Sequence, residues 1–157
     1  MQEAVTLANP KTYEYQVVRT SLLPGILKTI SSNKHLPLPL KLFEVSDIVL
    51  RDESKSRRAR NQRNVCFVYC GKTSGFEQIH GMLDRLMTVL NIPRSKGSDG
   101  YQIKESSNET YFPDRRADIY LGQLHIGSFG IIHPSVLTNF ELVSPCSALE
   151  LNLEPFI

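Results

Sequence analysis

Few residues of this 157-residue chain have the types and spacing that catalysis or metal binding requires. Cys66 and Cys70 fall on the same side of a predicted strand, because side chains alternate along a strand. A zinc site would need further cysteine or histidine close by, and this run supplies none. We therefore interpret Cys66, Cys70 and Cys146 as free, buried thiols, which are typical of proteins in a reducing compartment.

The histidines and one glycine-containing run are equally weak signals of chemistry. His80 could act as a general base on a helix, but the sequence shows no partner for it, so a helix-surface or interface position is favoured. His125 falls on a predicted strand, and His133 is a turn or helix-cap residue. The run Gly127–Gly130 lacks the length and the lysine of a phosphate-binding loop, and a β-bulge or close packing accounts for it better. The sequence thus predicts no catalytic, cofactor-binding or metal-binding residue.

Charge is spread unevenly along the chain, although the net charge is only +2. All 18 lysines and arginines stand at or before Arg116, and residues 117–157 carry four acids and no Lys or Arg. The tract Arg51–Arg63 holds six of the cations beside Asp52 and Glu53. It lacks the aromatic side chains that stack on bases, so any contact with nucleic acid would be made to phosphates. A disordered hairpin tip is the other interpretation.

The elements that would position these residues follow from the spacing of apolar side chains. A helix is predicted from Ser21, with Pro24 in its first turn. A second helix follows the capping-box order of Ser74–Glu77, and a short third one begins at His133-Pro134. Strands are predicted at Ala4–Leu7, Tyr15–Val18, Leu40–Leu50, Val65–Cys70, Tyr101–Lys104, Ala117–Leu121, Leu124–Gly127 and Ser147–Leu153, with a two-residue turn at Gly122-Gln123.

This order of elements predicts an α+β domain. Strands outnumber helices, tight connections join neighbouring strands, and no regular βαβ alternation occurs. We expect a single domain over residues 1–157, with an antiparallel sheet and helices on one face. No run approaches the ~20 apolar residues of a membrane span. The first residues do not form a signal peptide. The free thiols of a reducing compartment predict a cytoplasmic protein.

Three segments resemble the beta subunit of phenylalanyl-tRNA synthetase in its archaeal and eukaryotic form. They are Asn9–Thr12 leading into Val18–Gly25, then Pro37–Val45, and then Gly127–Pro134 continuing to Phe140 and the ending Leu149–Phe156. Their order and spacing cover nearly the whole chain, which makes the match specific. The resemblance implies a fold like that of class II aminoacyl-tRNA synthetase catalytic domains, an antiparallel β-sheet flanked by helices. It also implies that the chain is a carboxy-terminal fragment of a longer multidomain subunit.

The resemblance further implies a role within an enzyme. The family's ligase attaches phenylalanine to tRNA with ATP and magnesium, in an alpha2-beta2 assembly whose alpha subunit carries the active site. Class II catalytic domains hold ATP with an arginine in an Arg-x-Glu motif and a second arginine near the end of the domain. Here the matching strand reads Lys41-Leu42-Phe43-Glu44, without an arginine before Arg51, and residues 127–157 contain no Lys or Arg. We therefore expect a structural and assembly domain with a cation-poor groove and no cofactor of its own.

Three sets of residues are candidate sites under this interpretation. The apolar stripe of the first helix either is the interface with the alpha subunit or packs inside the domain: Leu22, Leu23, Ile26, Leu27 and Ile30. The basic tract is the candidate contact with tRNA phosphates: Lys55, Arg57, Arg58, Arg60 and Arg63. The polar side chains at alternate positions of the strands either line the face equivalent to a catalytic groove or belong to an ordinary solvated face of the sheet. They are Glu44, Ser46, Asp118, Tyr120, Glu150 and Asn152.

Two other functions stay open at this point. A catalytically competent, adenylate-forming domain would require the arginines that the matching strand and the closing segment lack. An independent RNA-binding module would rest on one localised basic tract in a chain of small net charge.

Overall fold

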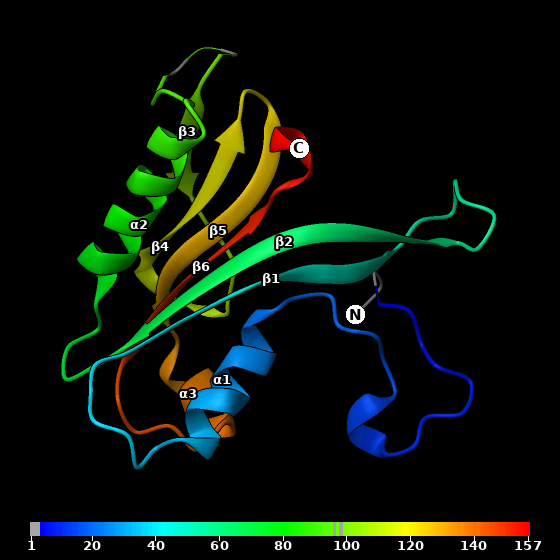
Figure 1. The fold of residues 1–157 in the computed structure, drawn as a ribbon, viewed down its shortest axis with the longest axis horizontal. Coiled ribbons are helices and arrows are strands. Elements are labelled where there is room, and N and C mark those ends of the chain that lie inside the picture. Colours follow the sequence, from blue (N-terminus) through cyan, green and yellow to red (C-terminus); the bar gives the residue numbers. More distant parts are fainter. Residues whose placement is uncertain (1–3, 96, 98) are drawn as a thin grey trace.

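A six-stranded antiparallel sheet forms the centre of the molecule (Figure 1). In the computed structural model, which describes residues 4–95, 97 and 99–157, the strand order is β1-β2-β6-β5-β4-β3. All neighbouring strands are antiparallel, so the predicted α+β class is confirmed. The elements are η1 (Tyr13–Tyr15), α1 (Leu23–Ser32), β1 (Leu40–Arg51), β2 (Ala59–Cys70), α2 (Phe76–Val89), β3 (Tyr101–Glu105), β4 (Tyr111–Leu121), β5 (Leu124–Ile132), α3 (Pro134–Asn139), β6 (Cys146–Asn152) and η2 (Glu154–Phe156).

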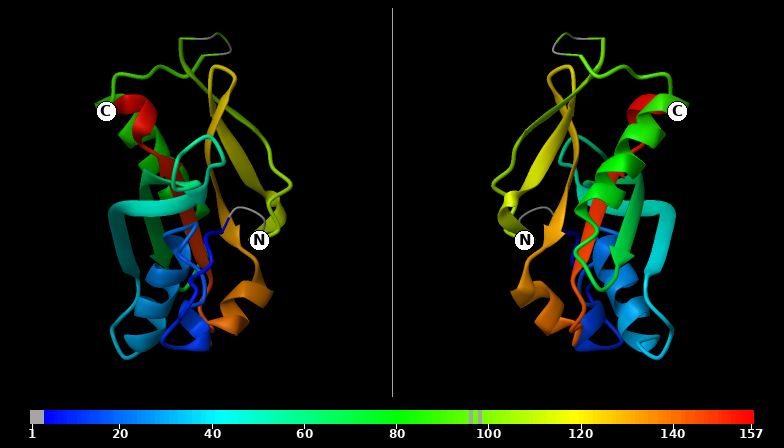
Figure 2. Two further views of the ribbon diagram at one scale, coloured as in Figure 1. Left: turned by 90° about the vertical axis from the view of Figure 1, so that its right-hand side faces the viewer. Right: turned by 90° about the vertical axis from the view of Figure 1, so that its left-hand side faces the viewer.

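The helices cover both faces of the sheet, and the expectation that they share one face is wrong. Helices α1 and α3 contribute to one core, which includes Leu27 and Val68. Helix α2 contributes to a second core, which includes Leu83 and Leu149. In Figure 2, α2 lies along the upper part of the sheet, whereas α1 and α3 lie together at its lower end. Helical periodicity shows which residues of a helix are buried but not which face of the sheet they cover, and the error follows from that limit.

Strands β1 and β2 form a long hairpin that extends into the basic tract. They pair in unbroken register from Leu40 opposite Cys70 to Arg51 opposite Ala59. The connection is therefore confined to residues 52–58, and the tract 51–63 is not a single polar loop. Asp47 and Arg63 are directly opposite each other and form an ion pair, which stabilises the polar part of the hairpin. The hairpin tip projects beyond the rest of the sheet in Figure 1.

Several local predictions hold. Gly122 has a φ of +59°, and Leu121 pairs with Leu124 across the predicted two-residue turn. His133 is the N-cap of α3, and its ring accepts a hydrogen bond from the backbone N–H of Ser135 at 3.1 Å.

Other local predictions fail. The predicted strands Ala4–Leu7 and Tyr15–Val18 reduce to a single bridge between Thr6 and Val17. The capping box at Ser74 does not form, because Gly75 is the N-cap of α2 with a φ of +70° and no side-chain cap bond is made. Capping is decided by the path of the chain into the helix, which the Ser-x-x-Glu order alone does not determine.

Candidate functional site

A polar groove opens on the face of the sheet that also carries α1. Its volume is about 600 Å³, and its walls come from β1, β2, β5 and β6 together with the segments that precede α1 and β4. Its polar floor includes side chains at alternate positions of β2 and β6, which point to the same face. The polar and charged residues of the lining are Thr20, Ser21, Arg51, Arg60, Gln62, Asn64, Asn108, Thr110, His125, Ser128, Glu150 and Asn152.

The strand register places the predicted polar residues opposite one another, in rows that run across neighbouring strands of the sheet. Glu44 lies opposite Cys66, and Cys66 lies opposite Glu150. The same row continues through Ser128 to Asp118. The next row joins Ser46 and Asn152 through Asn64 between them. Of the six residues predicted for this face, only Glu150 and Asn152 line the groove.

Glu150 is the centre of a hydrogen-bond network on the groove floor. Its carboxylate accepts from the Ser21 hydroxyl at 2.6 Å, from the Leu22 backbone N–H at 3.0 Å and from Asn64 Nδ2 at 2.9 Å. The amide of Gln62 donates to Asn64 Oδ1 at 2.9 Å, and Arg60 Nη1 donates to Gln62 Oε1 at 2.9 Å. The network joins β2 and β6 to the start of α1, and its acceptors are occupied by donors of the chain itself.

The Ser21 hydroxyl has a second role at the start of α1. It accepts a hydrogen bond from the Leu23 backbone N–H at 3.2 Å while it donates to Glu150. One of the N–H groups that a helix leaves unpaired at its first turn is thereby satisfied, and a carboxylate lies at the positive end of the helix dipole. The residues Arg60, Gln62 and Asn64 repeat at every second position, which is the sequence signal that could have revealed the other half of the network.

Two arginines line the groove, so the expectation of a cation-poor groove is wrong. Arg51 is the last residue of β1, and Arg60 is the second residue of β2. The sequence Arg51-Asp52-Glu53 has the Arg-x-Glu order, but at the far end of β1 from the segment that matches the family. Both guanidinium groups lie close to acids of the same hairpin: Arg51 Nη2 is 2.5 Å from Glu53 Oε1, and Arg60 Nε is 3.7 Å from Asp52 Oδ2.

The remaining members of the predicted polar set are engaged at the margins of this face. Arg19 donates to Glu44 Oε1 at 2.8 Å and to the Ser46 hydroxyl at 2.6 Å. Asp118 accepts from the Ser128 hydroxyl at 2.7 Å, and the rings of Tyr120 and His125 meet edge to face with centroids 5.2 Å apart. Arg19 binds residues along the outer edge of β1. The alternation of side chains along the strands does not predict this contact, because Arg19 lies outside the strands.

The chain matches a family model described as "Phenylalanyl tRNA synthetase beta chain CLM domain" over residues 1–153. It belongs to this family. The phenylalanine–tRNA ligase beta subunit of Mus musculus is 54% identical to it, over 99% of this chain and 26% of the relative. The corresponding subunit of Schizosaccharomyces pombe is 51% identical, over 96% of this chain and 28% of the relative. The chain thus spans about a quarter of the length of these relatives.

The fold is shared with a class of solved synthetase structures. A pyrrolysyl-tRNA synthetase from Desulfitobacterium hafniense superposes with a TM-score of 0.74 at 14% identity, over 98% of this chain and 52% of the other. At that identity the likeness concerns the fold alone. Among the described residues, no helix combines the length and the apolar character that crossing a membrane requires.

The apolar stripe of α1, predicted as the subunit interface of this beta-chain domain, is part of the domain's own core. Its five members are between 0% and 5% exposed. The helix has ten residues and a single apolar face, and that face is covered by the sheet and by α3. The prediction of a subunit interface is therefore corrected for all five residues, because the chain's own core covers them: Leu22, Leu23, Ile26, Leu27 and Ile30.

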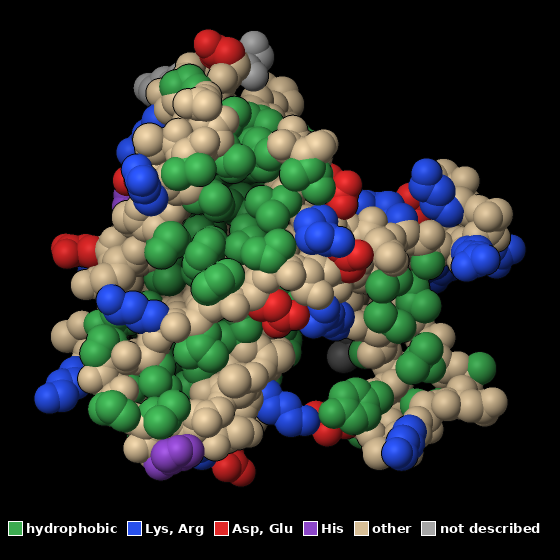
Figure 3. Space-filling view, viewed as in Figure 1, with side chains coloured by type: hydrophobic (Ala, Val, Ile, Leu, Met, Phe, Trp, Pro, Cys, Tyr) green, Lys and Arg blue, Asp and Glu red, His purple; other side chains and the backbone are tan. Residues whose placement is uncertain are grey.

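The cations of the basic tract divide into two groups in the structure. Arg63 is paired with Asp47, Arg60 lies near Asp52, and Arg58 Nε is 3.8 Å from Glu53 Oε2. Lys55 and Arg57 are exposed on the 52–58 connection. Figure 3 shows lysine and arginine side chains gathered at this tip. Hydrogen bonds from Ser54 hold the pKa of Asp52 below its ordinary value, with desolvation opposing them and the charges of Lys55 and Arg60 adding to them.

The cysteines and His80 occupy structural positions. Cys66, Cys70 and Cys146 are free and buried, as predicted. Burial, with smaller effects of the carboxylates nearby, raises the pKa of the Cys66 thiol well above its ordinary value, which makes the thiol a poor nucleophile. The His80 ring packs against Phe76 and Phe129, with centroid distances of 6.2 and 5.4 Å, and the two phenylalanine rings stack on each other 5.6 Å apart. No group of three or more metal-ligating side chains occurs among the residues that the structure describes.

Proposed function

We propose that this chain is the carboxy-terminal, structural domain of the beta subunit of a phenylalanine–tRNA ligase. The ligase attaches phenylalanine to tRNA in the cytoplasm, in an alpha2-beta2 assembly. ATP and magnesium are used by the alpha subunit, and the present domain supports assembly without performing catalysis. Membership of the beta-chain family and a class II synthetase fold support this proposal.

The observation that carries the proposal is the closed hydrogen-bond network around Glu150. A groove that binds ATP and an amino acid needs polar groups that are free to exchange water for substrate. Here the Glu150 carboxylate is taken up by Ser21, Leu22 and Asn64. Arg51, one of the two arginines that line the groove, lies against Glu53. The groove floor therefore acts as a structural tie between the sheet and α1.

The hairpin tip supports a contact with tRNA as a secondary role. Lys55 and Arg57 are exposed there, beside arginines that are partly neutralised by their own acids. No aromatic residue occurs between Arg51 and Arg63, so the tip fits phosphate contact and not recognition of bases. This role belongs to the complete ligase, and we do not extend it to an independent RNA-binding module.

The test compares two single arginine substitutions in the assembled ligase. Arg51→Ala removes the cation that lines the groove, and Arg57→Ala removes a cation of the same hairpin outside it. Phenylalanine-dependent exchange of pyrophosphate with ATP should change by less than about twofold in both variants, because neither residue meets the reacting groups. A loss of about a hundredfold in the Arg51→Ala enzyme alone, with the assembly intact, would establish the adenylate-forming alternative.

A further inference from the structure

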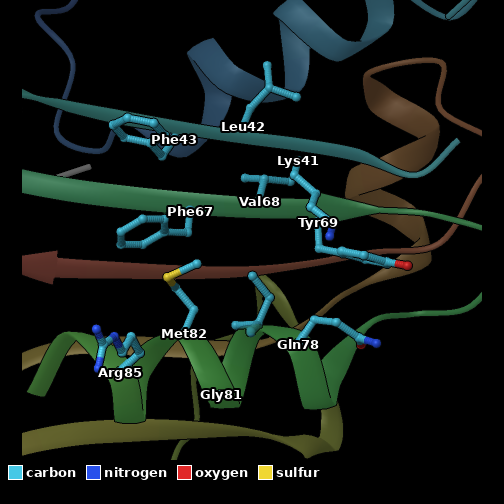
Figure 4. Close-up of a pocket in the computed structure, with 11 residues that line it drawn as sticks. Lys41, Leu42, Phe43, Phe67, Val68, Tyr69, Gln78, Gly81, Met82 and Arg85 are labelled. Atoms are coloured by element: carbon cyan, nitrogen blue, oxygen red, sulfur yellow. The ribbon is translucent and has the colours of Figure 1, made fainter. Parts of the chain in front are cut away.

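A second groove, on the opposite face of the sheet from the polar one, is apolar. It lies between α2 and the hairpin of β1 and β2 and has a volume of about 530 Å³. Figure 4 shows its walls: Phe43, Phe67 and Tyr69 come from the two strands, and Met82 and Gln78 come from the helix. Figure 3 shows the corresponding hydrophobic surface between α2 and the hairpin.

The strand that borders this groove carries unusually exposed apolar side chains. Phe43 is 70% exposed, Val45 is 49% exposed, and Met82 across the groove is 40% exposed. The rings of Phe43 and Phe67 stack on the sheet with centroids 5.9 Å apart. Helix α2 packs over the middle of the sheet and leaves this outer part uncovered. Contiguous apolar surface of this kind marks an interaction site more often than isolated exposed residues do.

The outer edge of β1 is half covered and half open. Near its end, the Val49 N–H donates to the Arg19 carbonyl at 3.0 Å, and the Asp47 carbonyl accepts from Arg19 Nε at 3.0 Å. Odd-numbered residues of β1 therefore direct their backbone groups away from β2. Lys41, Phe43 and Val45 share this phase, because the register with β2 has no irregularity over the strand.

The open half of this edge runs beside the apolar groove, which Lys41 and Phe43 line. Among the described residues, no hydrogen bond beyond the β1–β2 ladder reaches the backbone of Lys41, Phe43 or Val45. Native sheets protect such edges with charges, proline, bulges or covering segments. Here the stretch 41–45 pairs with β2 in regular register, and Lys41 is its one cation.

The charges around the groove indicate the chemistry of what covers it. Lys41 on β1 and Arg85 on α2 stand on opposite walls. No Asp or Glu is among the described residues that line the groove. A complementary segment would place apolar side chains at alternate positions, as a strand does, and a carboxylate near these two cations.

We propose that an extended segment of the alpha subunit adds a strand to the 41–45 edge of β1. Its backbone pairs with the outward groups of Lys41, Phe43 and Val45, its apolar side chains fill the groove against Phe67 and Met82, and a carboxylate meets Lys41 and Arg85. This inference rests on the proposed function, since it takes the alpha subunit as the partner. It moves the assembly surface from α1 to the opposite face of the sheet.

Amide hydrogen exchange in the full-length proteins tests the backbone pairing. In the beta subunit alone, the amides of Phe43 and Val45 should exchange quickly, while those of Leu42 and Glu44 are protected by β2. In the assembled ligase, exchange at Phe43 and Val45 should slow by on the order of tenfold or more. Fast exchange in the ligase would overturn the proposal. Slow exchange in the beta subunit alone would also overturn it, because another segment of the same chain would then cover the edge.

A matched pair of valine substitutions tests the side-chain contacts. Val45→Lys places a charge at the groove margin, whereas Val143→Lys makes the same change at a residue that is 98% exposed and far along the chain, between α3 and β6. Val45→Lys should weaken association with the alpha subunit by about tenfold, and Val143→Lys should leave it unchanged. Both unfolding midpoints should stay at the wild-type value, because both side chains can reach solvent. Equal affinities of the two variants would overturn the proposal.

Charge reversal tests the carboxylate. Lys41→Glu combined with Arg85→Glu should weaken association at low salt, and the difference from the wild type should shrink as salt is raised. If the affinity of this variant for the alpha subunit is reduced equally at low and high salt, the partner segment has no carboxylate at this position. The outcomes are separable from those of the proposed function: loss of pyrophosphate exchange in the Arg51→Ala ligase refutes the non-catalytic role, whereas unprotected Phe43 and Val45 amides in an active ligase refute only this contact.

Discussion

Replacing Glu150 by alanine should destabilise the chain by about 3 kcal/mol. The substitution leaves three donors without their acceptor: the Ser21 hydroxyl, the Leu22 N–H and the Asn64 amide. The Ser21 hydroxyl can rotate to find water, but Leu22 is 0% exposed and Asn64 is 5% exposed. A buried donor without a partner costs about 1–3 kcal/mol, and two of them set the expected magnitude.

The conservative variant Glu150→Gln separates the hydrogen bonds from the size of the side chain. Its amide oxygen can still accept from Leu22 and Asn64, and its NH₂ group can donate to the Ser21 hydroxyl, so the expected loss is about 1 kcal/mol. Glu109→Ala is the control, because Glu109 is an exposed turn residue, and it should shift stability by less than about 0.5 kcal/mol.

Urea unfolding of the wild type and the three variants measures these differences. The midpoint should fall with Glu150→Ala while the slope against denaturant stays constant, since the native surface is the same. On thermal unfolding, the alanine variant should melt about 6–12 °C lower for a chain of this size. If Glu150→Ala resembles Glu109→Ala, the network does not tie α1 to the sheet, and the structural interpretation of the groove fails with it.

Three further predictions concern other parts of the chain. Gly127→Ala should destabilise by about 2 kcal/mol or more, because an added Cβ would lie 2.1 Å from the Glu150 backbone oxygen, whereas Gly81→Ala on α2 meets nothing within 4 Å and should stabilise by about 0.5–1 kcal/mol; urea midpoints check both. A hydrogen bond from Arg63 holds the pKa of Asp47 below its ordinary value of 3.8, so the pair stabilises the fold above that pH and the stabilisation is lost as pH falls through the lower folded-state pKa. Unfolding midpoints between neutral pH and acid should therefore fall less for Asp47→Asn than for the wild type. In the assembled ligase, the double substitution Lys55→Ala and Arg57→Ala should make tRNA binding less sensitive to salt. The slope of the logarithm of the binding constant against the logarithm of salt concentration should become shallower by about 0.9 for each phosphate that the tip no longer neutralises, and the choice of tRNA should not change. Binding titrations at several salt concentrations measure this slope.

Local patterns in the sequence predicted those features that depend on a short range of residues. The alternation in β6 places Leu149 and Leu151 in the core, where both are 0% exposed. On α2, Ile79, Leu83 and Met87 recur at helical spacing and are buried, and Gly122 makes the predicted turn. These features follow from strand and helix periods and from the conformational freedom of glycine, which neighbouring residues are sufficient to reveal.

The features that decide function depend on residues far apart in the chain, and only the tertiary structure determined them. Glu150 and Ser21 are separated by 129 residues, and no local pattern links them. All five apolar residues of the α1 stripe are buried because the helix packs on the sheet, and the residues of the sheet that cover them come from distant parts of the chain. The hairpin extends to Arg51 and Ala59 because cross-strand partners such as Asp47 and Arg63 stabilise polar strand ends. A sequence states which side chains prefer to be buried or charged, but the partner of each is fixed only when distant segments pack together.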